Sequence, residues 1–482
     1  MTADTKPTRR EFVHGSVALA GTMLASPLAA VAEPSRTKPP NIIFFLGEGQ
    51  RADALSIAGN KILKTPNHDR IGAEGVRFTN AFCTNSLCAP ARATVLTGMY
   101  SSSTGALGNK DLNERMPADT PFFTEVLRNA GYEVAIVGKT HLRNGGEDRY
   151  WDYYFGHNAA ANNYWNPFYK EGRQGTIGPE KQYKNIYADE LAVERALDWL
   201  EHRQSEKPFC LLVWFMTPHA PFYRARRYLD LYRETVIPKP ATFDDDLKGY
   251  PGKPRCFVEA TNKIGTTVMG DACRSLEEVA KDYYAGLTAV DDMIGSILSA
   301  VEKKGILDDT AILQGSDHGY FLGEWRLYDK RLMHEPSIRV PLMIRYPKRI
   351  PAGTVRSEMV LDIDIAPTIL DLAGVAVPRN MQGKSVLPLA KEQNPEFRKE
   401  WYYEYFEWPG PEGVRPCRGI RTETHKYIEN LTEPVELEMY DLQKDPGELN
   451  NLAGVQEYTT LQRELKDRME KLRAAIPVRN SS

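Results

Sequence analysis

Apolar residues along the chain fall into short runs that alternate with segments of helical periodicity. Mainly apolar runs of strand length lie at 41–46, 132–137, 209–215 and 310–313. Amphipathic segments lie between them, at 120–130, 190–203 and 276–304. Runs without alternation are typical of strands buried on both faces. The order of strands and helices therefore predicts an α/β fold with a mostly parallel central sheet and helices on both faces.

A second pattern begins after the charged stretch at 391–399. Short segments of strand character at 400–407, 418–421 and 426–429 are followed by an amphipathic segment at 458–475. Strands so close in sequence pair most readily as antiparallel neighbours. We expect a large domain at 40–390 and a smaller C-terminal α+β subdomain with an antiparallel sheet at 391–482.

The N-terminal segment reads as an export signal. Arg9 and Arg10 form a twin-arginine pattern, an apolar run follows at 15–28, and small residues at 30–32 offer a cleavage site. The run is too short and too interrupted for a membrane anchor. We expect a signal peptide at 1–32, a linker at 33–39 and a mature chain without a membrane span. The twin-arginine export machinery of a bacterium would deliver it to the periplasm or outside.

Composition excludes some classes of protein. The chain has 482 residues, 42% of them hydrophobic and 26% charged, as in ordinary globular proteins, and its net charge of -3 gives no pull toward nucleic acid. Six cysteines are too few for a disulfide scaffold. Cys256 and Cys273 share an irregular segment and are the best candidates for a bridge, with free thiols as the alternative.

Polar side chains follow the predicted strands. They are Glu48, then Lys139 and His141, then His219, then Asp317 and His318, with Lys330 further along. Each of these residues, taken alone, is consistent with a solvent-exposed charge or with a histidine whose hydrogen bonds are satisfied within the protein. The carboxyl ends of parallel strands share one edge of a sheet, where open α/β folds bind ligands. Together these residues predict a site with fixed cations for an anionic group.

The segment around Cys88 carries the candidate nucleophile. Cys88, Pro90 and Arg92 stand at alternate positions, and 93–96 should form a helix whose N-terminal amides face an anion. A lone cysteine is most often a small buried hydrophobe. A thiol beside a fixed cation also suits a reactive group. The residues leave both interpretations open.

Taken together, these motifs resemble the type I sulfatases of the alkaline phosphatase-like superfamily. The resemblance rests on Cys88–Arg92 with 96–98 behind it and extends over blocks at 40–51, 65–82, 131–142, 316–324 and 330–344. It implies that a formylglycine-generating enzyme oxidises Cys88 to formylglycine, whose hydrate attacks a sulfate ester. Export of a folded chain would require this conversion in the cytoplasm.

The resemblance also implies a role for each residue. Arg92 and Lys139 would hold the hydrate and the sulfate oxygens, His141 would take a proton as sulfate leaves, and His219 and Lys330 would serve the leaving oxygen. One Ca²⁺ would be held by Glu48, Asp317, His318 and residue 88. The family usually has two successive ligands after the first strand, whereas this chain has Glu48 and then Gly49. An aspartate at position 49 is therefore expected to raise metal affinity.

These features predict an exported sulfatase that hydrolyses a sulfate monoester on a carbohydrate. The aromatic-rich segment at 150–169 suits either sugar stacking or a satellite core, and 152–168 is similar to sulfatases acting on N-acetylglucosamine 6-sulfate. One alternative is a phosphoester or phosphonate hydrolase of the same superfamily. Another is a non-catalytic carbohydrate-binding relative, for which Gly49 is the motivating feature.

Overall fold

A computed structural model provides the structure of the chain. It describes residues 38–109, 120–142, 147, 149–159, 162–173, 175–244, 253–266, 273–391, 396–409 and 413–478. The expected signal peptide and nearly all of the expected linker lie outside these residues. None of the helices in these ranges combines the length and the apolar character that crossing a membrane requires.

Eleven strands in the described part of the chain form one central sheet. They are β1 (Asn41–Gly47), β2 (Val76–Phe82), β3 (Glu133–Lys139), β4 (Tyr153–His157), β5 (Phe168–Gly172), β6 (Lys181–Gln182), β7 (Phe209–Trp214), β8 (Thr310–Ser316), β11 (Arg339–Arg345), β12 (Thr354–Arg356) and β13 (Val360–Leu361). The order is β12-β2-β11-β8-β1-β7-β3-β4-β5-β6, and β13 pairs with β2. Neighbours from β8 to β4 pair in parallel, whereas β11 and β5 run antiparallel to that group. The mostly parallel sheet is confirmed.

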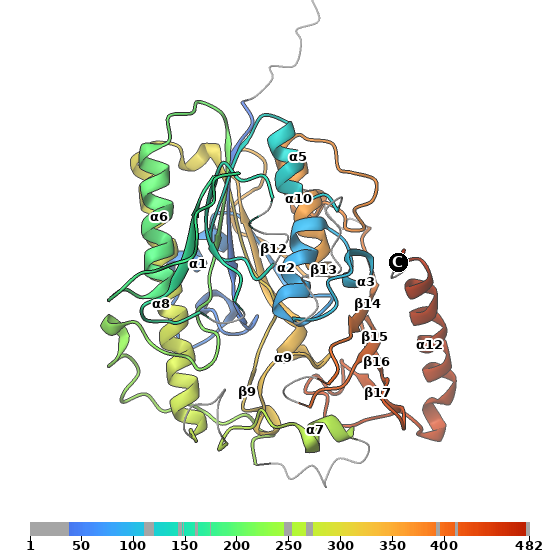
Figure 1. Ribbon diagram of the computed structural model, residues 1–482. Helices are drawn as coiled ribbons and strands as arrows, with labels where there is room; N and C mark the ends of the chain where they lie inside the picture. The colour runs from blue at the N-terminus through green and yellow to red at the C-terminus, as the bar shows by residue number, and fades with distance from the viewer. Residues whose placement is uncertain are drawn as a thin grey trace, which may run out of the picture. The chain divides into compact units, whose positions relative to one another are not determined.

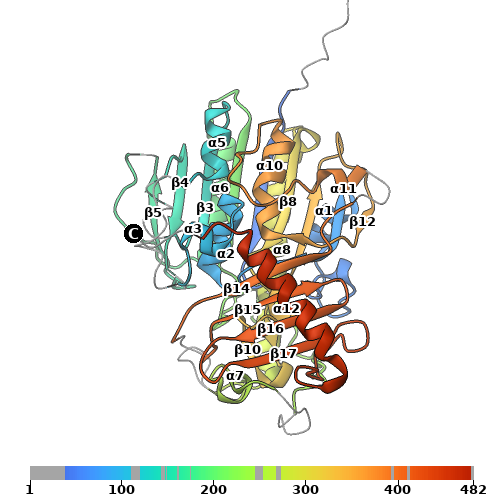
Figure 2. The same ribbon diagram turned by 90° about the vertical axis from the view of Figure 1, so that its right-hand side faces the viewer.

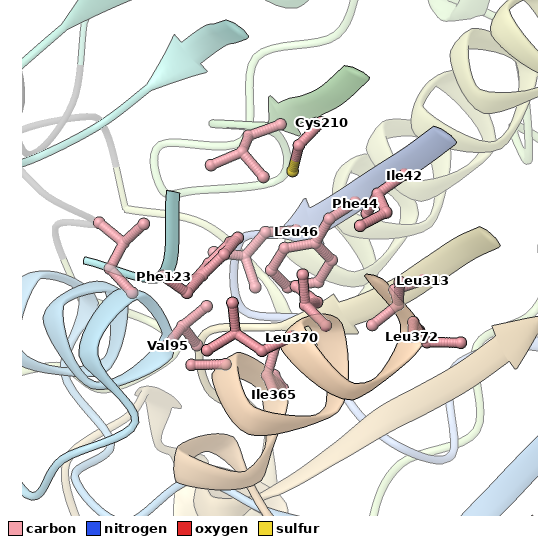
Figure 3. Packing of buried hydrophobic residues seen from close by; sticks show 14 of the residues in the cluster. Ile42, Phe44, Leu46, Val95, Phe123, Cys210, Leu313, Ile365, Leu370 and Leu372 are labelled. Atoms are coloured by element: carbon pink, nitrogen blue, oxygen red, sulfur yellow. The ribbon is translucent and has the colours of Figure 1, made fainter. Parts of the chain in front are cut away.

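Helices cover both faces of this sheet, as Figure 1 shows. One face carries α1 (Pro66–Ala73), α6 (Ala188–His202) and α8 (Leu276–Lys303), and the other carries α2 (Cys88–Thr97), α5 (Phe123–Asn129), α10 (Ile365–Ala373) and α11 (Leu387–Lys391). Alternate residues of β1 face opposite ways: Ile42 and Phe44 pack in one apolar cluster and Ile43 in the other. Figure 3 shows the first cluster, where Phe44 meets Leu313 and Leu370.

The C-terminal part contains an antiparallel sheet with a helix packed against it (Figure 2). Its elements are β14 (Glu400–Tyr405), β15 (Cys417–Thr422), β16 (His425–Asn430), β17 (Glu436–Asp441) and α12 (Thr459–Ala474). Leu465 and Met469 anchor α12 in an apolar cluster that also holds Trp401 and, from the large domain, Phe82. The antiparallel sheet is confirmed, while the domain boundary at 390/391 stays a prediction.

Short elements connect these layers, and two expectations need correction. The short elements are α3 (Ser101–Thr104), α7 (Arg255–Glu259), α9 (Glu335–Ile338), β9 (Phe321–Leu322) and β10 (Tyr328–Asp329).

The helix expected at 93–96 begins earlier, at Cys88. Pro90 is tolerated in the first turn of a helix, because the backbone N–H that proline lacks would have no hydrogen-bond partner there. Cys256 and Cys273 form no bridge: Cys256 is buried in α7, Cys273 is exposed, and both are free thiols.

Candidate active site

Parallel strands bring the expected polar residues to one edge of the sheet. Glu48 directly follows β1, Lys139 ends β3, and Asp317 follows β8, which pairs with β1 up to Gly47 and Ser316. His219 lies on the turn after β7, the neighbour of β1 on its other side. All of these side chains are buried. Residues far apart in the sequence therefore share one enclosed polar centre.

The carboxylate of Glu48 is the centre of this group. Its Oε2 accepts from Lys139 Nζ at 2.7 Å and from Arg92 Nη2 at 2.8 Å. Its Oε1 lies 3.9 Å from Lys330 Nζ and 3.9 Å from His219 Nε2. Burial favours the neutral acid, but Lys139 and other nearby donors outweigh it and hold the pKa of Glu48 well below its ordinary value. Glu48 is thus an ionised carboxylate surrounded by cations.

Cys88 is the first residue of α2 and points at the same centre. Its Sγ lies 3.1 Å from Glu48 Oε1 and 3.4 Å from His318 Nε2. Burial opposes ionisation of the thiol, and the Glu48 carboxylate opposes it too. The cations Lys139 and Lys330 outweigh both effects, so the pKa of Cys88 lies well below its ordinary value. Cys88 therefore has the electropositive setting of a reactive group rather than that of a buried hydrophobe.

Arg92 is buried and binds the carboxylates of both Glu48 and Asp317. Its Nε donates to Asp317 Oδ2 at 3.1 Å and its Nη2 donates to Glu48 Oε2. Its Nη1 donates to the carbonyl of Lys139 at 2.6 Å. All three nitrogens thus have protein acceptors, and the guanidinium fixes Glu48 and Asp317 relative to one another. This geometry shows a positioning contact, whereas the expectation gave Arg92 direct contact with sulfate oxygens.

Two histidines at the centre are held as neutral rings. Burial is the main cause that lowers the pKa of His141 to about 4, and burial also lowers the pKa of His219. The Nδ1 of His219 lies 2.6 Å from the carbonyl of Ala220, which leaves Nε2 facing Lys330 Nζ at 3.5 Å. Because a carbonyl only accepts, Nδ1 carries the proton and Nε2 offers its lone pair. His219 and Lys330 therefore form a donor–acceptor pair.

Sequence reasoning missed Asp329, which positions Lys330. Its Oδ1 lies 3.0 Å from Lys330 Nζ, and its other oxygen accepts from Arg331. Asp329 has a φ of 93°, a backbone conformation that is costly for a residue with a side chain. Its position directly before Lys330 was the only signal in the sequence. The strained backbone at Asp329, the last residue of β10, and the ion pair hold the Lys330 ammonium toward Glu48.

Four side chains converge as candidates to hold a divalent cation. The ligand atoms of Glu48, Cys88, Asp317 and His318 all lie within 4.8 Å of one another. The Nδ1 of His318 lies 2.8 Å from the carbonyl of Gly319, so Nε2 is the nitrogen left to bind a metal. Two carboxylates, an imidazole and residue 88 fit a divalent cation. The set of candidate metal ligands is small, because Gly49 contributes no side chain.

Tyr320 closes the space beside Gly49. Gly49 has a φ of 59°, and a Cβ at this position would lie 2.9 Å from the Tyr320 ring. The Gly49 N–H donates to Asp317 Oδ1 at 3.1 Å, and the Gly49 carbonyl accepts from Tyr283. A side chain at position 49 would therefore have to displace the Tyr320 ring before it reached the metal ligands. Tyr320 and Tyr283 are further residues that the sequence did not single out.

The buried aromatic residues of the segment at 150–169 belong to the two main apolar clusters on the faces of the central sheet rather than to a separate satellite core. Trp151, Tyr154, Tyr164 and Tyr169 are all buried. Tyr164 also donates its hydroxyl to the backbone carbonyl of His219, so part of this core supports the turn that carries His219. Of the rings in this segment, Tyr150 is exposed and could reach a ligand in solvent.

Comparison with known proteins identifies this architecture. The family model for sulfatases matches residues 40–375, and a model described as N-sulphoglucosamine sulphohydrolase, C-terminal, matches 323–475. The chain is 33% identical to an N-acetylglucosamine-6-O-sulfatase of Bacteroides thetaiotaomicron, over 93% of this chain and 89% of that protein. It is 31% identical to an ulvan-active sulfatase of Formosa agariphila, over 92% and 82% respectively. The chain therefore belongs to the sulfatase family of the alkaline phosphatase-like superfamily and is a sulfuric ester hydrolase.

Solved structures show the same fold. One, of a protein in complex with its substrate D-glucosamine-2-N,6-O-disulfate, has a TM-score of 0.83 and 32% identity, covering 92% of this chain and 100% of that one. A phosphonate monoester hydrolase of Agrobacterium radiobacter has a TM-score of 0.74 at 21% identity, covering 91% and 96%. The second likeness concerns the fold alone.

Proposed function

We propose that this sulfatase hydrolyses a sulfate monoester of a carbohydrate with a nucleophile made from Cys88. The observation that carries the proposal is the position of Cys88, buried at the start of α2 with its Sγ 3.1 Å from Glu48 and under the field of Lys139 and Lys330. Once formed, a formylglycine at position 88 supplies a hydrate oxygen as nucleophile. A divalent cation, calcium by family resemblance, would be held by Glu48, Asp317, His318 and residue 88 and would supply positive charge at the sulfate.

The remaining chemistry falls to side chains of the chain itself. Lys139 and Lys330 provide fixed positive charge for the sulfate oxygens in a water-poor site. Neutral His141 is suited to accept a proton when sulfate leaves position 88. Lys330 and His219, 3.5 Å apart, are suited to deliver a proton to the departing alcohol oxygen. Arg92 keeps Glu48 and Asp317 in place for the metal.

The carbohydrate part of the proposal rests on relatives and on one surface feature. The relatives described above are named for N-acetylglucosamine 6-sulfate and for ulvan, and a similar structure contains a disulfated glucosamine. Tyr223 follows the His219 turn, is 47% exposed, and packs edge-on against Tyr164, which bonds to His219. An exposed ring so close to the catalytic turn suits stacking on a sugar.

We also propose export by the twin-arginine route, with cleavage near residue 32. The support is the Arg9-Arg10 pattern and the apolar run behind it. A reporter fused to residues 1–40 tests the route: export should stop when both arginines become lysine. Export that continues through the variant would point to another pathway.

Mass spectrometry of the peptide containing Cys88, from protein made in a host with a formylglycine-generating enzyme, tests the nucleophile. Formylglycine should be present, and Cys88→Ala should abolish hydrolysis of a sulfated sugar while the protein stays folded. An unmodified thiol in protein that still hydrolyses the sugar would overturn the mechanism.

A phosphoester or phosphonate hydrolase is the second candidate. The chain is 28% identical, over 88% of its length and 93% of the relative, to a multifunctional alkaline phosphatase superfamily protein of Trinickia caryophylli. Rates on matched aryl sulfate, phosphate and phosphonate esters discriminate between the two functions. A preference for phosphate or phosphonate would favour this alternative.

A further inference from the structure

Trp408 presents a large aromatic side chain to solvent, just beyond the end of β14 at Tyr405. The residue is 48% exposed, whereas five of the seven tryptophans in the chain are buried. An exposed indole ring forgoes the free energy that burial would supply. Such a ring suits contact with a ligand when it is held in place and lies near the active site.

Arg415 covers one face of the Trp408 ring and holds it in place. Its guanidinium lies over the indole, 5.3 Å from the ring centroid. Arg415 is itself only 9% exposed, and its Nη1 donates to Thr432 Oγ1 at 2.8 Å while its Nη2 donates to Glu259. This anchored guanidinium leaves the opposite face of the ring to solvent. The indole is thus pre-organised, so a ligand that stacks on it does not have to order the side chain first.

Glu407, which directly precedes this ring, connects it to the catalytic edge of the sheet. Its Oε1 accepts from the N–H of Asn109 at 3.2 Å, and Asn109 Oδ1 accepts from the N–H of Ala89 at 3.2 Å. Its Oε2 lies 3.8 Å from Nε of Arg331. Ala89 is the second residue of α2, and Arg331 directly follows Lys330. Glu407 therefore joins the chain next to the ring to both of these segments.

A second set of contacts leads from Arg415 to the same lysine. Glu259, the partner of Arg415, is the last residue of α7. Three residues further on, the Asn262 carbonyl accepts from the N–H of Tyr328 at 3.0 Å, and the Asn262 side-chain amide donates to the Tyr328 carbonyl. Tyr328 lies two residues before Lys330. Both sets of contacts thus converge beside this lysine and place the ring on its side of the active site.

We propose that Trp408 is a stacking platform for a second sugar residue of the leaving saccharide. The inference rests on the proposed function, in which Lys330 and His219 serve the departing alcohol oxygen. The saccharide attached to that oxygen extends away from this pair. Tyr223 lies on the His219 side and Trp408 on the Lys330 side, so the two exposed rings flank the path of the leaving group. The preferred substrate is therefore a sulfated oligosaccharide rather than a single sugar.

The surroundings of the ring suit the apolar face of a sugar rather than a further sulfate group. An anionic group would need a free donor at the open face of the indole. Arg415 does not offer one, because its Nη1 and Nη2 already donate to Thr432 and Glu259 and its Nε is buried. The open face is a flat apolar surface, on which the C–H groups of a sugar ring can pack.

Calorimetric titration measures the contribution of the ring. The full-length Cys88→Ala protein, which lacks the proposed nucleophile, is titrated with N-acetylglucosamine 6-sulfate and with a glucosamine-based tetrasaccharide that ends in the same sulfated sugar. The tetrasaccharide should bind at least about twofold more tightly than the monosaccharide. Adding Trp408→Ala should weaken binding of the tetrasaccharide by about 2–10-fold, the value of one stacking contact, and binding of the monosaccharide by less. Equal affinities before the substitution, equal losses after it, or no binding of the tetrasaccharide would overturn the proposal.

Two further variants separate stacking from a structural role. Trp408→Phe keeps an aromatic face and should retain most of the affinity for the tetrasaccharide. Val455→Ala removes an apolar side chain of similar exposure, 43%, from the same subdomain and should change neither affinity. A loss with Trp408→Phe as large as that with Trp408→Ala would contradict stacking.

Size-exclusion chromatography of wild type and Trp408→Ala tests whether the ring instead joins two copies of the chain. The two proteins should elute together, and a dimer that dissociates in the variant would overturn the proposal in favour of a subunit interface. Failure of the proposed function is distinguishable. Tetrasaccharide binding that depends on Trp408, without sulfate ester hydrolysis by the wild type, would refute only the function. Hydrolysis by the wild type with tetrasaccharide affinity independent of Trp408 would refute only this inference.

Discussion

The sulfur of Cys88 lies 3.1 Å from Oε1 of Glu48, although 40 residues separate the two in the chain. The contact joins the N-terminus of a helix to the end of the central strand of a parallel sheet. It places the candidate nucleophile and a candidate metal ligand at one point, where fixed cations from other strand ends also converge. Because these groups lie so close together, we expect each single substitution around this site to have its own measurable effect on activity, metal binding or stability.

Asp329→Asn should slow release of the leaving group. The substitution keeps the shape of the side chain but removes the charge that holds the Lys330 ammonium. We expect kcat to fall by about 10–100-fold for a sugar sulfate and by much less for an aryl sulfate, whose leaving group needs less protonation. Steady-state kinetics on both substrates measure the difference. Equal losses on the two would indicate a general structural role.

His141→Gln should lower kcat by about 10²–10⁴-fold with little change in KM, because glutamine cannot accept a proton. The wild-type pKa of about 4 means that His141 is neutral above pH 4 and becomes charged below it. The rate that depends on neutral His141 should therefore be lost as pH falls through about 4. A pH–rate profile of both proteins checks this, and a wild-type acidic limb that persists unchanged in the variant would contradict the role.

Gly49→Asp should bind a divalent cation more tightly but fold less stably. The new carboxylate adds a ligand and a negative charge, and its Cβ forces the Tyr320 ring to move. Overpacking of this kind costs about 1–3 kcal/mol of unfolding free energy. Chemical denaturation and calorimetry measure the two effects. Gly49→Ala is the control, because it adds the Cβ without the carboxylate and should lose stability without gaining affinity.

Glu404→Gln should stabilise the protein at high pH. Burial raises the pKa of Glu404 to about 7, while its carboxylate oxygen accepts from the Ser102 N–H at 2.7 Å. A carboxyl with a raised folded pKa favours folding at low pH, and that contribution is lost as pH rises from about 4.5 through about 7. Glutamine keeps a hydrogen-bond acceptor for the Ser102 N–H and avoids the buried charge. The gain in the free energy of unfolding should therefore reach about 3 kcal/mol at pH 8 and vanish near pH 4.

Urea unfolding of Glu404→Gln and wild type at several pH values measures this gain. The exposed Glu423 provides the control, since Glu423→Gln should show no comparable dependence on pH. A gain for Glu404→Gln that is constant across pH would show that the buried charge is not its cause.

Tyr223→Ala should weaken the use of extended sulfated sugars more than the use of an aryl sulfate. The ring is half exposed and lies off the candidate catalytic centre, so its removal should raise KM for the sugar by about 2–10-fold, the value of one stacking contact. Val236→Ala, which removes a more exposed apolar side chain elsewhere, is the control. Equal effects on both substrates would argue against a sugar-binding surface.

The layout of the catalytic edge was predictable from local pattern. Buried parallel strands appear in the sequence as apolar runs. Polar residues that follow such runs lie at one edge of the sheet regardless of loop conformation, so Glu48, Lys139 and Asp317 could be placed together. The start of α2 was harder, because Pro90 discourages a helix in most positions and is accepted only in a first turn. The aromatic segment also stayed open until its burial was known.

The sequence by itself determined the α/β fold, because periodicity and spacing are local properties, and its motifs implied the candidate nucleophile Cys88 and the gap at Gly49 through their resemblance to the type I sulfatases. Only the tertiary structure showed that Arg92 donates to the carboxylates of Glu48 and Asp317. It also showed that Asp329 restrains Lys330 and that Tyr320 fills the space beside Gly49. Contacts of this kind join residues more than two hundred positions apart or depend on the path of an irregular loop. Their energies depend on distance and burial, which the order of residues does not contain.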